Sequence, residues 1–138
     1  MYSEENLDPT RVMEGSNAKI FVDGEPETYA QEFTADVEDD EKTFNVIGSE
    51  WEHVKSSTKK GSFSLKGLKT TSKWLKIGFK RFELLTELND PEAFGFERIR
   101  YKNCKVKKLQ LANIKAGETI EEEIEGTFSG YELLDAIE

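Results

Sequence analysis

Few side chains of this sequence could act as a nucleophile or a general base. The chain has a single histidine, His53, and a single cysteine, Cys104, and two serines, Ser56 and Ser57, follow the histidine closely. A nucleophilic site needs such groups within hydrogen-bond reach of one another. No second motif brings them together, so we expect His53 to be an ordinary surface residue and Cys104 a small buried apolar one. The sequence therefore predicts no catalytic residues and a protein that is not an enzyme.

A run of carboxylates could bind a cation. It contains Asp36, Glu38, Asp39, Asp40 and Glu41. The run resembles a calcium loop in composition only, because it lacks the central glycine and the closing glutamate at the required spacing. One histidine and one cysteine cannot build a zinc site or an internal disulfide, and no GxxxxGK[ST] sequence is present to bind phosphate. We expect no metal and no cofactor.

Charge is distributed along the chain in blocks of alternating sign. Residues 1–52 hold 15 acidic and 3 basic side chains, 53–82 hold 9 basic, 83–97 hold 5 acidic, 98–115 hold 7 basic and 116–138 hold 8 acidic. We expect each block to lie beside one of opposite sign, in the same subunit or in the next, and the alternative is that the blocks are solvated faces. The net charge of −9 argues against duplex DNA or an anionic membrane as the main partner.

The length and composition predict one compact domain. The chain has 138 residues, of which 36% are hydrophobic and 11% aromatic, enough for an ordered core. No apolar run approaches the length of about 20 residues that a membrane-spanning helix needs, and the acidic start does not resemble a signal peptide. Residues 1–14 predict a mobile N-terminal arm. We expect a cytoplasmic protein unless a partner moves it.

Alternation of apolar and polar residues predicts a structure dominated by β-strands. Strands are expected at 18–22, 31–40, 43–47, 61–68, 83–88, 96–111 and 119–128. Asp23-Gly24 predicts a two-residue hairpin turn after the first strand. The apolar phase slips twice within 96–111, which predicts two β-bulges there. Residues 48–57 are polar and predict a long loop.

One amphipathic helix is expected in the middle of the chain. Thr70 and Thr71 offer an N-cap, and the helical pattern continues to about residue 82. Its core-facing residues are expected to be Trp74, Leu75, Phe79 and Phe82. The lysines between them would face solvent, so the helix is predicted to pack on the sheet.

Two long hairpins are expected to bracket this helix. The first pairs the acidic strand around Asp36 with the basic strand around Ser64, and the second pairs the basic strand around Lys105 with the acidic strand around Glu123. The predicted fold class is mainly β with one helix (α+β). One face of the sheet is apolar and covered by the helix, and the other is charged in bands. The unpaired edges of such a sheet favour association with further copies.

Several stretches, taken in order, resemble the tail tube proteins of contractile phages and of R-type, diffocin-like bacteriocins, in particular the PBSX-like group. They are GSNAKIFVDGE, EFTADVEDDEKTFNVIG, STKKGSFSLKGLKTTSKWL, YKNCKV and ETIEEEIEGTFSGYEL, within residues 15–133. The resemblance implies that residues 1–138 form a single tail-tube domain, an antiparallel β-sandwich or split barrel with one helix. It also implies six copies in a ring, and rings stacked into a hollow tube inside a contractile sheath.

In that family the two long hairpins of each subunit contribute four strands to a continuous barrel around the lumen. If the polar faces point into the lumen, the residues that line it are Glu32, Asp36, Glu38, Lys60, Lys66, Lys105, Lys107, Glu121, Glu123 and Glu125. Their net charge of −2 per subunit would not hold passing DNA by its phosphates. The arm, with Pro9 and Arg11, and the 48–57 loop, with Trp51 and His53, are expected to contact neighbouring subunits.

The resemblance implies further copies of the chain, a sheath protein, baseplate or initiator proteins and a tail terminator as partners. It implies assembly in the bacterial cytoplasm and a final place in an extracellular particle, with no membrane binding and no specific nucleic-acid binding by the subunit. The alternative is a β-barrel that binds single-stranded nucleic acid through the basic strands around Lys60 and Lys105, with Phe63 or Tyr101 as stacking platforms. An enzyme of unrecognised type is a third reading.

Overall fold

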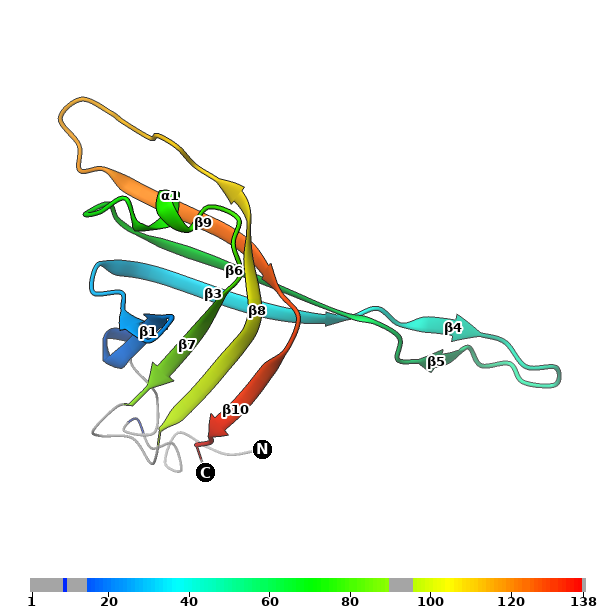
Figure 1. Cartoon of the computed structure of the whole chain (residues 1–138). Helices are drawn as coiled ribbons and strands as arrows, with labels where there is room; N and C mark the ends of the chain where they lie inside the picture. The colour runs from blue at the N-terminus through cyan, green and yellow to red at the C-terminus, as the bar shows by residue number, and fades with distance from the viewer. Residues whose placement is uncertain (1–8, 10–14, 90–95, 138) are drawn as a thin grey trace.

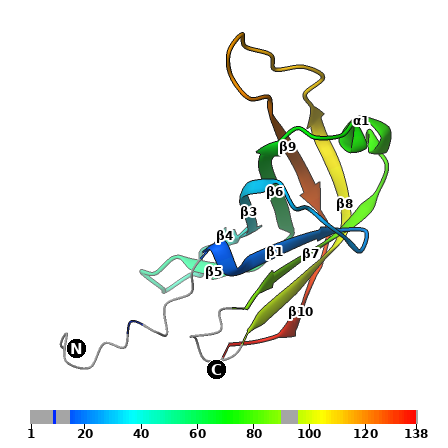
Figure 2. The same cartoon turned by 90° about the vertical axis from the view of Figure 1, so that its left-hand side faces the viewer.

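The computed structural model of the chain describes residues 9, 15–89 and 96–137, and Figures 1 and 2 show its arrangement. In chain order the elements are η3 (Gly15–Asn17), β1 (Ala18–Val22), β2 (Glu25–Pro26), β3 (Ala30–Asp39), β4 (Lys42–Phe44), β5 (His53–Lys55), β6 (Lys59–Leu68), α1 (Lys73–Ile77), β7 (Phe82–Leu88), β8 (Glu97–Leu109), β9 (Glu121–Phe128) and β10 (Tyr131–Asp135). The predicted fold class, mainly β with one helix, is confirmed.

Apart from β4 and β5, which pair with each other, the strands form two sheets that share β8. The hydrogen-bonded order is β2-β1-β7-β8-β9-β6-β3, and β10 also pairs with β8. The first half of β8 lies between β7 and β10, whereas its second half pairs with β9. We call β3, β6, β9 and the second half of β8 the four-strand sheet, and β2, β1, β7, β10 and the first half of β8 the five-strand sheet. Together they form an open, split β-sandwich (Figure 1).

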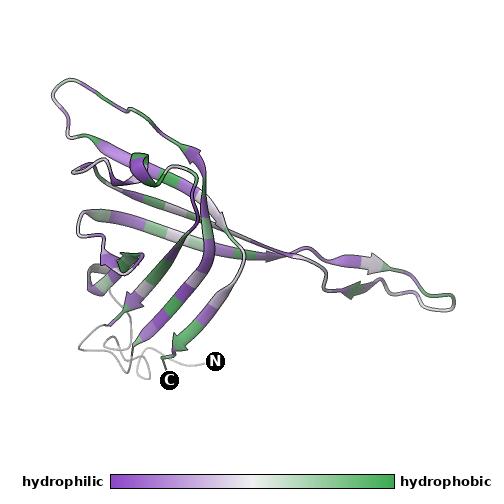
Figure 3. Ribbon diagram, viewed as in Figure 1, coloured by the Kyte–Doolittle hydropathy of each residue, from purple (hydrophilic) through white to green (hydrophobic). Residues whose placement is uncertain are grey.

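Both predicted hairpins are present in the four-strand sheet. β3 and β6 pair antiparallel with Asp36 opposite Ser62, and β8 and β9 pair antiparallel with Lys105 opposite Thr127. The two hairpins are joined because β6 also pairs antiparallel with β9. Apolar and polar residues alternate along these strands (Figure 3), so one face enters the core and the other faces solvent.

The two bulges predicted for the long strand are confirmed in β8. The first lies between Tyr101 and Cys104, where Asn103 has a φ of 52°. The second lies between Val106 and Lys108. An extra residue at each position resets the alternation. As a result Tyr101, Cys104 and Val106 all enter the core despite their irregular spacing.

The predicted hairpin turn at Asp23-Gly24 is also confirmed. Both residues have positive φ angles, 49° and 85°, and Val22 pairs with Glu25 across the turn. This is the geometry that a two-residue turn of this composition favours. The turn places Asp23 beside β7, where its Oδ1 accepts a hydrogen bond from the Glu83 backbone N–H at 2.9 Å.

The predicted 48–57 loop is wrong in part, because residues 53–55 form β5. β5 pairs with β4, with Phe44 opposite His53. Figure 1 shows that β4 and β5 continue the β3–β6 hairpin as a long projection. We call residues 40–58 the hairpin arm. Within the hairpin arm β4 and β5 pair with each other, and among the described residues they pair with no other strand.

The predicted helix is much shorter than expected. α1 has five residues and ends at Gly78, whose positive φ of 57° favours glycine. Phe79 is consequently 56% exposed rather than core-facing. Phe82 is buried as predicted, but it belongs to β7. Among the residues described, no helix has the length and apolar character needed to cross a membrane.

Aromatic side chains join the two sheets and the helix in one core. Trp74 of α1 contacts Phe82 of β7 edge-on, with ring centroids 5.4 Å apart. Phe82 contacts Phe63 of β6 at 5.9 Å, and Tyr101 of β8 contacts Phe128 of β9 at 5.1 Å. Edge-to-face pairs of this kind add to the gain from burial. Trp74 is thus the residue by which α1 is anchored, whereas Leu75 is only half-buried.

Candidate functional site

The solvent-facing side of the four-strand sheet carries columns of side chains that alternate in sign. The columns are Glu32, Asp36 and Glu38 on β3; Lys60 and Lys66 on β6; Glu121, Glu123 and Glu125 on β9; and Lys105 and Lys108 on β8. Lys66 lies between Glu32 and Glu123, with its Nζ 4.0 Å from Glu123 Oε1. Cross-strand pairs of opposite charge favour this register by about 0.2–1 kcal/mol each. We call this surface the polar face.

One member of the polar face was missed in the sequence. The expected residue was Lys107, two positions after Lys105, but the second bulge of β8 falls at this point. Lys108 is therefore the register partner of Glu125. The slip of the apolar pattern from Val106 to Leu109 was the signal that could have placed Lys108 on this face.

Both edges of the four-strand sheet are open. Among the described residues, β3 pairs only with β6, and the second half of β8 pairs only with β9. Neighbouring strands are antiparallel throughout, so the two edge strands run in opposite directions. Unpaired N–H and C=O groups on edges of this length are templates for pairing with another chain. One edge is acidic and the other is basic.

The hairpin arm exposes apolar side chains to solvent. They are Phe44, Val46, Ile47, Trp51 and Val54. Trp51, one of the predicted contact residues, is 79% exposed. His53, another, stacks on Phe44 with ring centroids 5.4 Å apart, and its Nε2 lies 3.2 Å from Ser49 Oγ. Of the remaining two, Pro9 is exposed and Arg11 lies outside the described residues.

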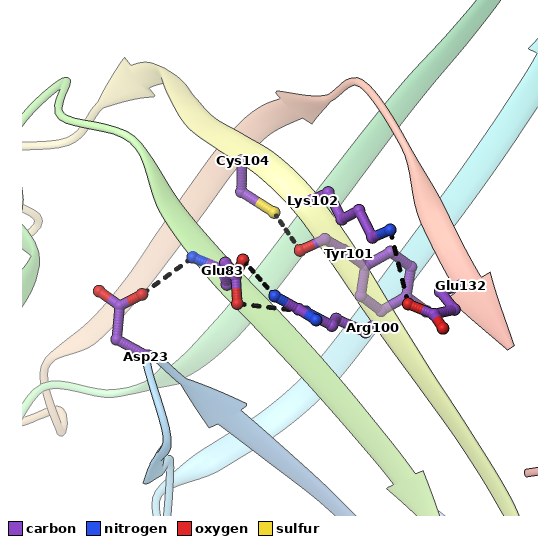
Figure 4. A network of polar contacts seen from close by, with 7 residues as sticks. All are labelled: Asp23, Glu83, Arg100, Tyr101, Lys102, Cys104 and Glu132. Atoms are coloured by element: carbon purple, nitrogen blue, oxygen red, sulfur yellow. Dashed lines mark hydrogen bonds and ion pairs between the residues drawn. The ribbon is translucent and has the colours of Figure 1, made fainter. Parts of the chain in front are cut away.

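Several charged side chains of the five-strand sheet are paired within the chain (Figure 4). Arg100 binds Glu83 through two hydrogen bonds, with Nη2–Oε1 at 2.7 Å and Nε–Oε2 at 3.2 Å. This contact lowers the pKa of Glu83 and raises that of Arg100. Lys102 Nζ lies 3.5 Å from Glu132 Oε2. These bonds tie β7, β8 and β10 together, so they belong to the fold.

The candidate nucleophile and base are separated by the fold. Cys104 is fully buried, and its burial raises the pKa of the thiol to about 11. Its Sγ donates to the Tyr101 carbonyl oxygen at 3.5 Å. His53 lies on the exposed hairpin arm. A neutral thiol inside the core is a poor nucleophile, and the prediction that Cys104 is a small buried apolar residue is confirmed.

The two aromatic residues expected to stack on bases in the nucleic-acid-binding alternative are buried. Phe63 is 3% exposed and Tyr101 is 8% exposed, and both rings pack in the core. Base stacking requires an exposed aromatic face. Lys60 and Lys105 are exposed, but Lys60 stands opposite Glu38. The prediction that Phe63 or Tyr101 serves as a stacking platform for nucleic-acid bases is therefore wrong.

Known proteins share this sequence pattern and fold. The chain is 23% identical over 137 residues to the phage-like element PBSX protein XkdM of Bacillus subtilis (strain 168), with 92% of this chain and 93% of that protein covered. Its fold is similar to that of a chain in the sheath–tube complex of PVC, an extracellular contractile injection system in the extended state. The TM-score is 0.72 at 10% identity, covering 99% of this chain and 100% of that one.

A further similar fold occurs in the tail of an empty gene transfer agent particle, solved with C6 symmetry. The TM-score is 0.58 at 14% identity, covering 92% of this chain and 99% of that one. At such low identities these structures show a shared fold. A family model described as phage tail tube protein matches residues 5–135, nearly the whole chain. The chain, with its open-edged sheet and alternating columns of charge, belongs to the phage tail tube protein family.

Proposed function

We propose that this chain is the structural subunit of the inner tube of a contractile phage tail or phage-tail-like bacteriocin, and that it closes into hexameric rings which stack into a hollow conduit. The alternation of charge across the polar face is the observation that carries the proposal. Its four columns run acidic, basic, acidic, basic, so the sheet ends with an unpaired basic edge on β8 and an unpaired acidic edge on β3.

Ring closure would pair β3 of one subunit with the second half of β8 of the next. The strands of each subunit alternate in direction, so this seam is antiparallel like every other pairing in the sheet. The alternation of charge would continue through the seam without a break. Closing the ring would also remove both open edges. The six-fold symmetry of the gene transfer agent tail, whose fold is similar, supports six copies.

The polar face would line the lumen, because the opposite face of the same sheet is buried in the core. Phe63, Leu65 and Ile124 occupy that opposite face and are at most 4% exposed. The proposed lining residues are Glu32, Asp36, Glu38, Lys60, Lys66, Lys105, Lys108, Glu121, Glu123 and Glu125. Six acidic and four basic side chains leave a mildly acidic bore with little affinity for phosphates.

The remaining partners would be those of a contractile particle. The similar chain in the PVC sheath–tube complex supports a surrounding sheath. A baseplate or initiator at one end and a terminator at the other would limit the length of the tube. The exposed Trp51 and His53 on the hairpin arm, together with Pro9 and Arg11 near the N-terminus, would contact neighbouring subunits. Assembly would take place in the bacterial cytoplasm, and the finished particle would be extracellular.

Electron microscopy of the purified protein and of the native particle tests this proposal. We expect hollow tubes or rings of uniform width from concentrated protein, and side-chain density for this chain around the lumen of the particle. Fluorescence anisotropy with a single-stranded oligonucleotide in 50 mM salt should show almost no binding. A particle whose lumen is lined by another chain would contradict the proposal, and steeply salt-dependent oligonucleotide binding would support the nucleic-acid alternative.

A further inference from the structure

A large apolar side chain is exposed at the corner where α1 leads into β7. Phe79 is 56% exposed and is followed by two cations, Lys80 and Arg81. The corner is held against β8, because Arg81 Nη1 donates to the Asn103 carbonyl oxygen at 3.5 Å. A single exposed apolar residue is common on protein surfaces. It becomes informative when a complementary cavity exists elsewhere on the molecule.

Such a cavity lies on the opposite flank, between β3 and the five-strand sheet. Its volume is about 910 Å³, and its apolar walls include Phe33 and Ala35 of β3 and Ile99 of β8. The charged residues around it are Lys19, Glu27, Glu32, Glu87 and Glu97. We call it the β3 groove. Figure 2 shows α1 on one side of the molecule and β3 on the other, so the groove cannot receive Phe79 of its own subunit.

We propose that Phe79 of one subunit inserts into the β3 groove of the next subunit in the ring. This inference rests on the proposed ring closure. At that seam β3 lies beside the second half of β8, and residues 79–81 flank the same edge of β8, since Phe82 pairs with Cys104. Phe79 then lies next to the core-side surface of the neighbouring β3, which forms one wall of the groove.

The charges around the two surfaces are complementary. Lys80 and Arg81 accompany Phe79, whereas the groove carries four carboxylates and one lysine. Glu27 is already paired with Lys73 of its own subunit, and Glu32 belongs to the polar face, where it stands opposite Lys66. Glu87 stands in register between Lys19 and Arg98, which leaves Glu97 to attract the incoming cations. Opposite charges around an apolar anchor favour one partner and one orientation.

This contact would give each seam two layers. Backbone pairing between β3 and β8 would form the inner layer at the lumen, and the insertion of Phe79 would form the outer layer. The contact is heterologous, because different surfaces of the same chain meet, and heterologous contacts generate closed rings when the rotation between copies closes. The occupant of the β3 groove is therefore a second copy of this chain.

Cross-linking tests the placement directly. The variant with Lys80→Cys and Ala35→Cys keeps Phe79 and puts one thiol on the corner and one in the groove, and a short bismaleimide reagent is added to assembled rings or tubes. A ladder of covalent oligomers ending at the ring number is expected on a denaturing gel. The two single-cysteine variants are the controls, and the native Cys104 is fully buried. Assemblies without a ladder would overturn this inference alone, whereas absence of any assembly would overturn the proposed function as well.

Substitution of Phe79 tests its contribution. Phe79→Ala should raise the concentration needed for assembly by about tenfold, the loss expected for an aromatic anchor, while Phe79→Leu should restore most of it. Ile114→Ala, at a residue 73% exposed in the β8–β9 connection, is the matched control. Thermal unfolding of the monomeric variants separates assembly from folding. Assembly of Phe79→Ala at the wild-type concentration would contradict the proposal.

Discussion

Replacing Asp36 with lysine tests the proposed seam most directly. Asp36 lies in the middle of the acidic column of β3, and its register partner on β6 is the uncharged Ser62. The neighbouring acids differ in this respect, since Glu38 stands opposite Lys60 and Glu32 opposite Lys66. The charge of Asp36 is therefore available to the basic edge of the next subunit. The Asp36→Lys substitution should weaken assembly while leaving the monomer folded.

The size of the effect follows from the geometry of neighbouring strands. Two unit charges about 5 Å apart on a water-facing surface interact by about 0.8 kcal/mol, in agreement with about 0.2–1 kcal/mol for cross-strand pairs. Reversal removes one attraction and adds a repulsion of similar size, so each seam should lose about 0.5–2 kcal/mol. This corresponds to a decrease of about 2- to 30-fold in the association constant per seam. The exposed monomer position should change by no more than about 0.5 kcal/mol.

The assay is the protein concentration at which rings or tubes form, measured by sedimentation in 50 mM and in 1 M NaCl. The difference from wild type should disappear at 1 M, where the Debye length is about 3 Å. Addition of Lys105→Asp to the same chain should restore assembly at low salt. Glu118→Lys, an equal change of net charge in the β8–β9 connection, is the control. Unchanged assembly of Asp36→Lys at low salt would refute a seam between the columns, and loss of folded monomer would refute the assignment of Asp36 to the polar face.

Three further predictions concern the folded subunit. Gly126→Ala should destabilise the monomer by about 1–3 kcal/mol in denaturant unfolding, because the added Cβ would collide with the Lys105 carbonyl oxygen and come within 2.5 Å of Phe63 Cζ. Gly130→Ala is the control and should be nearly neutral, since the nearest contact of its Cβ is at 3.6 Å. Equal losses of stability in the two variants would contradict the packing around Gly126. Cys104 should resist thiol reagents at pH 8 until the chain is unfolded, since its pKa is raised to about 11, and rapid labelling of the native protein would show that the core is open. Burial raises the pKa of Glu122, so the folded state retains this proton to higher pH than the unfolded chain, and stability falls as pH rises through that interval. Glu122→Gln should therefore raise the melting temperature at pH 7 and flatten the dependence of the melting temperature on pH. An unchanged pH dependence would show that Glu122 is not its cause.

Features that depend on local pattern were predictable from the amino-acid sequence. The period-two alternation placed β3 and β6 and predicted that they pair, and the slips of that alternation predicted both bulges of β8. The Asp23-Gly24 turn was predictable because two consecutive positive φ angles favour such residues. The polar face was likewise predictable, apart from Lys108, because alternation determines which side chains share a face.

Features that depend on which elements meet became visible only in the folded chain. The amphipathic pattern extended to Phe82, but Gly78 ends α1 and Phe82 pairs with Cys104, so Phe79 is left exposed. Phe63 and Tyr101 look like stacking platforms in sequence and are buried by side chains from distant strands. The open edges of β3 and β8, and the groove behind β3, arise from pairing order. Periodicity repeats within a few residues and can be read locally, whereas burial and free edges depend on partners far away in the chain.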